Sequence, residues 1–191
     1  MRIKFVWVAS IALSAALLTV ASGSTATDDA INNALNAIAD KLEKGDTDGA
    51  KKAAKEMADK TDVEDFMHGF KLRKQGGVGV GKKDTITPDG IELKINSIAR
   101  DGMTAAAMKK EADALARAGN VAAAIGMVAL AKAPEKDDGK KKKSDWNEWA
   151  NSMVQSSGEF AKAAKAEDAA SLRKVATKLK QSCDSCHMVF K

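Results

Sequence analysis

The chain has 191 residues, of which 31 are Lys or Arg and 26 are Asp or Glu, so its formal net charge at pH 7 is +5. This near balance, with lysines spread along the whole chain, gives no case for nucleic-acid binding. Two prolines, no tyrosine and many alanines and lysines predict an all-helical protein. Alanine side chains are small, so such a chain buries little apolar volume in its core. A bulky apolar cofactor would help to fill that core.

Residues 1–26 have the pattern of a secretory signal peptide. Arg2 and Lys4 precede an apolar run over 5–20, and small residues follow over 21–26. A transmembrane anchor is the alternative, but the run is shorter than the roughly 20 apolar residues that a span needs. We therefore expect an exported, periplasmic mature chain without a membrane span. Its charge would be about +3, because two bases and no acid are removed.

Residues 27–88 predict a helical hairpin followed by a long glycine-rich loop. Helical spacing of apolar residues predicts a first helix that stops at Gly45, and Asp46 offers a cap for a second helix. Between Thr61 and Pro88 the periodicity lapses. The apolar face of the first helix consists of Ile31, Leu35, Ile38 and Leu42.

The glycine-rich loop contains a near match to a nucleotide-binding motif. Gly76 to Lys82 fits Gly-x-x-x-x-Gly-Lys, but Lys83 follows where magnesium binding needs Ser or Thr, and no predicted strand precedes the loop. We expect a flexible linker here, or a loop that packs against the edge of a cofactor.

Residues 89–191 return to helical periodicity. The pattern from Ile91 weakens at Asp101 and Gly102, which predicts one long kinked helix or two. Gly119 and Asn120 interrupt the chain before a further helix, which Pro134 ends. The lysine-rich run over 135–143 predicts a solvated loop. The helix after it has an inward stripe of Trp146, Trp149, Ala150, Met153, Ser157 and Phe160.

The last helix carries the motif with the most chemical content. Cys183-Asp-Ser-Cys186-His187 fits the haem-attachment pattern Cys-x-x-Cys-His. Two thiols at this spacing reach the two vinyl groups of a porphyrin while the adjacent imidazole binds the iron. The motif belongs to the apolar stripe Leu172, Val175, Ala176, Leu179, Cys183, Cys186, His187 and Phe190. We therefore predict one covalently bound haem c on the core-facing side of this helix.

Two other interpretations of the cysteine pair remain open. Cys183 and Cys186 could form a disulfide or a dithiol redox pair, but that motif usually starts a helix beside a βαβ unit, and no strands are predicted. Zinc would need two further ligands, and His68 is the only histidine besides His187.

The C-terminal position of the motif adds a family resemblance. The ending Cys183-Asp-Ser-Cys-His-Met-Val-Phe-Lys191 and the approach Ala163-Ala-Lys-Ala-Glu-Asp-Ala-Ala-Ser-Leu172 resemble the class II cytochromes c, the cytochrome c-prime family. The resemblance implies an antiparallel four-helix bundle that holds the haem, with His187 as the proximal ligand and a homodimer through the first two helices. The four helices would span about 91–118, 120–133, 145–165 and 168–190.

The second axial position of the iron has several candidate occupants. His68 is the sole spare imidazole, and Phe66 and Phe70 beside it could cover a haem face. Rival ligands are Met67, Met103 and Met108, of which the last two lie where the family places any distal contact. An open site is the remaining alternative.

These observations predict a mono-haem electron carrier that exchanges electrons with redox partner proteins and is not an enzyme. The first alternative is a five-coordinate haem protein that binds a small gas such as nitric oxide. The second alternative is a structural helical protein with a disulfide.

Overall fold

The structure is a computed structural model that describes residues 24–190. Within that range every regular element is a helix, which confirms the all-α fold class. The predicted signal peptide lies almost wholly on residues 1–23, outside the described residues. In chain order the elements are α1 (Ser24–Glu43), α2 (Thr47–Ala58), α3 (Val63–Met67), the 3-10 helices η1 (His68–Phe70) and η2 (Arg73–Gln75), α4 (Ile91–Asp101), α5 (Ala105–Ala131), α6 (Lys143–Lys165) and α7 (Ala169–Phe190).

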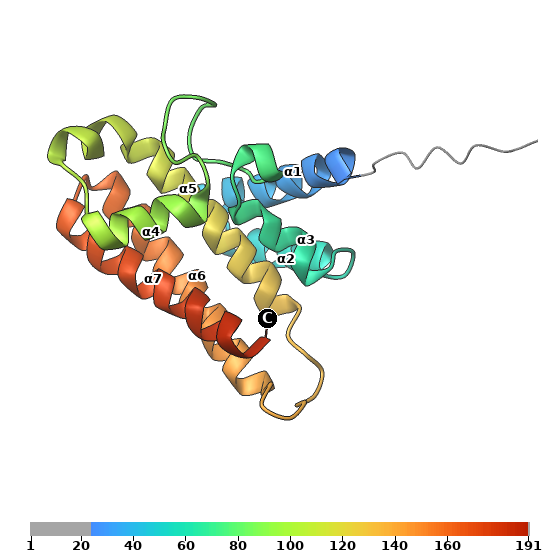
Figure 1. The fold of residues 1–191 in the computed structure, drawn as a ribbon. Coiled ribbons are helices and arrows are strands. Elements are labelled where there is room, and N and C mark those ends of the chain that lie inside the picture. Colours follow the sequence, from blue (N-terminus) through green and yellow to red (C-terminus); the bar gives the residue numbers. More distant parts are fainter. Residues whose placement is uncertain (1–23, 191) are drawn as a thin grey trace, which may run out of the picture.

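α1 and α2 form the predicted N-terminal hairpin. Gly45 takes a positive φ of 76° between them, a conformation that glycine adopts without steric cost. The Asp46 carboxylate caps α2 by accepting a hydrogen bond of 2.9 Å from the backbone N–H of Gly49. Both helices pack on α5, as Figure 1 shows.

The segment between α2 and α4 contains short helices that periodicity did not predict. α3, η1 and η2 are five residues or shorter, too short to repeat an apolar pattern. The glycine-rich loop after η2 wraps around Arg73, whose guanidinium donates hydrogen bonds to the backbone oxygens of Val78, at 2.7 Å, and Gly81. Asp89 Oδ2 lies 3.8 Å from the same guanidinium. Backbone carbonyls around a cation are the reverse of a phosphate-binding loop, which presents N–H groups.

The helix break predicted at Gly119 and Asn120 is wrong, because α5 continues through both residues. The chain breaks earlier: Gly102 ends α4 with a φ of 72°, and the Thr104 hydroxyl caps α5 by accepting from the backbone N–H of Ala107. Asn120 is therefore a helical residue. Of the two predicted alternatives, one long kinked helix or two helices, the structure has two, α4 and α5.

Gly119 has a packing role in place of a helix-ending one. A Cβ at this position would lie 2.9 Å from the Ser157 backbone oxygen and 2.9 Å from the Ala161 backbone nitrogen, both in α6. α5 and α6 therefore approach closely at this point, and a missing side chain permits the approach.

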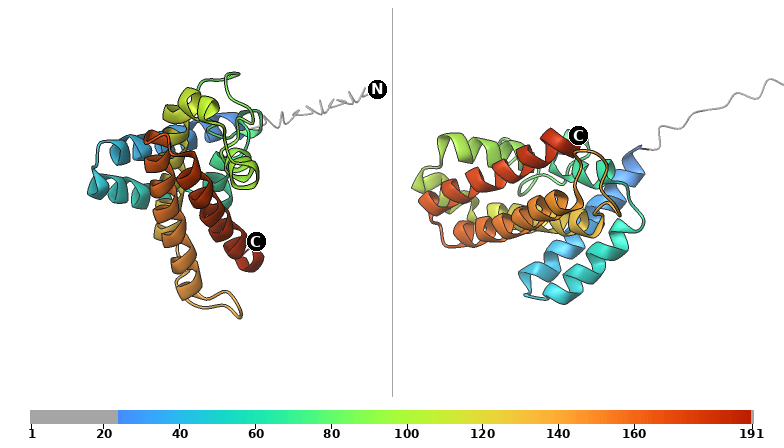
Figure 2. Two further views of the ribbon diagram at one scale, coloured as in Figure 1. Left: turned by 90° about the vertical axis from the view of Figure 1, so that its left-hand side faces the viewer. Right: turned by 90° about the horizontal axis from the view of Figure 1, so that it is seen from below.

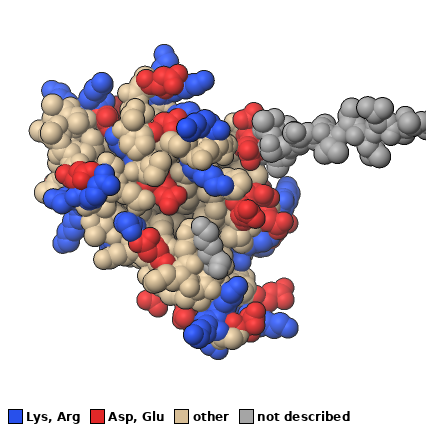
Figure 3. Space-filling model, viewed as in Figure 1, with Lys and Arg blue, Asp and Glu red and all other residues tan. Residues whose placement is uncertain are grey.

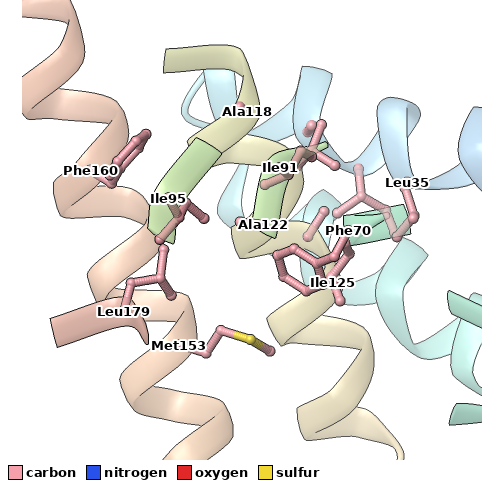
Figure 4. Close-up of a cluster of buried hydrophobic side chains, with 14 of the residues drawn as sticks. Leu35, Phe70, Ile91, Ile95, Ala118, Ala122, Ile125, Met153, Phe160 and Leu179 are labelled. Atoms are coloured by element: carbon pink, nitrogen blue, oxygen red, sulfur yellow. The ribbon is translucent and has the colours of Figure 1, made fainter. Parts of the chain in front are cut away.

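The helices share one continuous hydrophobic core. α5 packs on α6, α6 on α7, and α7 on α4, while α1 and α2 contact α5. Figure 2 shows α6 and α7 side by side. Buried side chains from α1, η1, α4, α5, α6 and α7 meet in Figure 4, from Leu35 at one side to Leu179 at the other. The core therefore extends from the N-terminal hairpin into the C-terminal helices.

α5 packs against α1, α2, α3 and α6. By length and composition alone it could cross a membrane, but 67% of its most apolar window is buried inside the protein. Its burial among the other helices accounts for its apolar sequence.

Candidate functional site

The C-terminal half of α7 carries the three residues of the predicted haem motif. Leu172 and Leu179 are fully buried and fix the rotation of α7 about its axis. Positions three and four residues further along share that face of the helix. Cys183 and Cys186 are accordingly half-buried free thiols, and His187 is exposed at the edge of the same face.

Two adjoining cavities meet at this motif. The inner cavity, of about 90 Å³, lies between α4, α6 and α7, and Cys183, Cys186 and His187 all line it. The outer cavity, of about 530 Å³, lies between α7 and the α3 and η1 segment. Its volume falls within the roughly 300–1,000 Å³ of small-molecule and cofactor sites. The residues that line both cavities are Met67, Glu92, Trp146, Cys186 and His187.

Aromatic side chains hold the end of α7 against α6. The Phe190 ring stands edge-on to Trp146, with ring centroids 5.0 Å apart, and to Trp149, at 6.0 Å. The Trp146 indole N–H donates a hydrogen bond of 2.7 Å to the Ala129 backbone oxygen. Trp146 and Phe190 both line the outer cavity, so this cluster forms an apolar wall beside the motif.

Both thiols lie in surroundings that favour their protonated form. Burial raises the pKa of the Cys183 thiol to about 11, and the negative charge of Glu92 adds to the shift. Burial also raises the pKa of Cys186. Dithiol redox centres need the opposite shift, toward a reactive thiolate. The surroundings of the pair therefore disfavour the dithiol interpretation.

His68 lines the outer cavity together with His187, so the fold brings the two histidines to one space. Of the two aromatic residues expected to cover a haem face, Phe70 lines the inner cavity. Phe66 does not, because its side chain is fully buried in the core and lines neither cavity.

The candidate methionines separate into two groups. Met67 lines both cavities. Met108 is fully buried in the core, Met103 packs against that core, and neither lines the cavities. The structure thus places the last two away from the motif, because the chain turns at Gly102 before either of them.

The charged residues at the rim of the cavities could not be predicted from the sequence. Glu92 and Lys71 look like ordinary surface positions along the chain, and only the tertiary arrangement brings them beside Cys186. Lys180 and Asp184 form an ion pair one turn apart on α7. Figure 3 shows bases and acids interspersed over this face of the molecule, without a large area of one sign.

Within residues 24–190, no three His, Cys, Asp or Glu side chains converge on a point that could hold a metal ion directly. Comparisons of the chain with protein-family models, curated proteins and solved structures found no match.

Proposed function

We propose that the protein is an exported mono-haem c-type cytochrome. Cys183 and Cys186 form thioether bonds to haem c, and His187 is the proximal iron ligand. The observation that carries this proposal is the position of the motif: all three side chains face one inner cavity, and Cys186 and His187 also border a second. The donor set fits the group, because two thiols and an imidazole are the side chains that haem c requires.

The proposed fold family is that of the class II cytochromes c. In this proposal α4, α5, α6 and α7 correspond to the antiparallel four-helix bundle, and α1 to α3 are an N-terminal addition. The contacts of α5 with α6, α6 with α7 and α7 with α4 support it. A homodimer through the first two bundle helices would need a surface of α5 that α1 and α2 leave free, since both pack on that helix.

The proposed role is electron transfer with redox partner proteins in the periplasm. When bound, the haem supplies a one-electron iron couple. The chain's own residues hold it and set its environment: Trp146, Trp149 and Met153 form apolar walls that exclude water, and His187 fixes the iron from α7. Exclusion of water and the choice of axial ligand are the means by which a protein tunes such a potential.

Spectroscopy and a redox titration of the exported protein test this function. The protein is produced in a host that has covalent haem-attachment machinery. We expect a coloured product whose absorption spectrum cycles reversibly between two states in a one-electron titration. A colourless product with a Cys183–Cys186 disulfide would support the structural alternative and overturn the proposal.

The cysteine variants show whether attachment depends on both thiols. Cys183→Ala and Cys186→Ala should each leave at most one thioether, which shifts the spectrum of the haem in alkaline pyridine. Ser185→Ala is the matched control on the same turn of α7 and should keep both thioethers.

A further inference from the structure

We propose that His68 is the second axial ligand, so that the iron is six-coordinate between α7 and the segment of α3 and η1. This inference rests on the proposed function and adds to it the coordination state. His68 and His187 are the two histidines of the chain. They come from elements more than one hundred residues apart in sequence, yet both line the outer cavity.

The backbone around His68 is held firmly against the core. Phe66 and Phe70, on either side of it, are 0% and 8% exposed. Gly69 fits tightly, since a Cβ there would lie 2.7 Å from Leu35 Cδ1. The Gly69 backbone oxygen accepts a hydrogen bond of 3.1 Å from the Val78 N–H, which attaches the glycine-rich loop to the segment. His68 is therefore presented from a fixed position, as a preorganised ligand requires.

The side chain of His68 is available for coordination. It is half-buried, and within the described part of the chain its imidazole makes no hydrogen bond to protein. Neutral imidazole is the commonest metal ligand that proteins use. A half-buried imidazole that lines the same cavity as a second imidazole suits a two-histidine haem iron.

Met67, which lines both cavities, is the methionine that competes with His68 as the second axial ligand. Its side chain packs against the hydrophobic core as well as lining the cavities, so its contacts already account for its position. A pair of imidazoles gives a low-spin iron with a lower potential than a His and Met pair, because methionine ligation raises the potential. It also leaves no vacant position for a gas.

The first test uses the unmodified haem-loaded protein. Ferric electron paramagnetic resonance and near-infrared magnetic circular dichroism should both report a low-spin iron with two nitrogen ligands. The ferrous protein should not change its spectrum under carbon monoxide. A high-spin ferric signal, or the sulfur-to-iron charge-transfer band of a methionine ligand, would overturn the proposal.

The second test uses His68→Ala with Met67→Leu as its matched control. His68→Ala should become high-spin and bind carbon monoxide, and added imidazole should restore the low-spin spectrum, which a purely structural role would not allow. Met67→Leu should remain low-spin. An unchanged low-spin spectrum in His68→Ala would overturn the ligand assignment while the haem, still attached, leaves the proposed function standing. A wild-type protein without haem would overturn both.

Discussion

The Trp146 indole N–H donates a hydrogen bond of 2.7 Å to the backbone oxygen of Ala129, and this contact fastens the first turns of α6 to the end of α5. Trp146 is 7% exposed, so the bond forms away from water. Its ring also packs edge-on against Phe190, the last described residue of α7. One side chain thus joins three helices at the end of the molecule where the haem motif lies.

Trp146→Phe should lower the free energy of unfolding by about 1–2 kcal/mol, since it removes a buried hydrogen bond and part of the ring packing. Trp149 supplies the control. It is half-buried, contacts Phe190 in the same edge-on geometry and makes no hydrogen bond through its indole within the described residues. Trp149→Phe should therefore cost less than Trp146→Phe in urea unfolding of the haem-loaded protein. Equal costs would contradict the role given to the hydrogen bond.

Two helical glycines should respond in opposite directions to the same change. Gly158→Ala adds a Cβ to α6 where nothing lies within 4 Å, so it should raise the free energy of unfolding by about 0.5–1 kcal/mol through helix propensity. Gly119→Ala should lower it by about 1–3 kcal/mol, because its Cβ would overlap the backbone of α6. Thermal and urea unfolding measure both. A stabilising Gly119→Ala would show that α5 and α6 are not in close contact there.

Lys94 and Glu111 form a buried ion pair between α4 and α5, with Nζ 2.6 Å from Oε2 and side chains only 9% and 15% exposed. Lys94→Met should cost about 3 kcal/mol, since it leaves a carboxylate buried without its partner. The double variant Lys94→Met with Glu111→Leu should be more stable than Lys94→Met alone.

The exposed pair of Lys55 and Asp59 on α2 serves as the control, and Lys55→Met should change stability by less than about 1 kcal/mol. If the buried pair and the exposed pair had equal effects, the link between α4 and α5 would not depend on this contact.

Asp168, at the start of α7, should make the free energy of unfolding depend on pH in the acid range. The Asp168 carboxylate accepts hydrogen bonds from the side chain and from the backbone N–H of Ser171. The side-chain bond is the larger cause and the backbone bond the second, and together they hold the pKa of Asp168 below its usual value. A lowered folded-state pKa stabilises the protein above the unfolded pKa of about 3.9, and this contribution is lost as the pH falls through the folded value.

At pH 7, Asp168→Ala should therefore lower the Tm by a few degrees, and the difference from wild type should shrink below about pH 4. Asp168→Asn keeps a capping oxygen without the titration, so its Tm should stay near wild type at pH 7. A difference that persisted unchanged at pH 2.5 would argue against Asp168 as the titrating group.

The parts of the site that depend on local chemistry could be predicted from the sequence. Cys183, Cys186 and His187 share a helix face because their spacing follows the helical repeat, and the structure places them at one cavity. The outer wall could not be predicted. α3 and η1 are too short to leave a periodic pattern, and Glu92 reaches the motif only through the packing of α4 on α7.

The continuity of α5 was missed for a different physical reason. Glycine ends helices, but it also permits close helix contacts, and sequence alone does not separate these two uses at Gly119. At Gly102 the helix-ending use applies, as its φ of 72° shows. The tertiary contact of Gly119 with α6 decides the other case.

Mass spectrometry of the C-terminal tryptic peptide of the exported protein tests whether haem is covalently attached to Cys183 and Cys186. Cleavage after Lys180 releases residues 181–191, which contain both cysteines and His187. We predict that this peptide carries the mass of one haem, retained after acid and organic solvent because both thioether bonds are covalent. A peptide of unmodified mass, or one lighter by the two hydrogens of a disulfide, would contradict it.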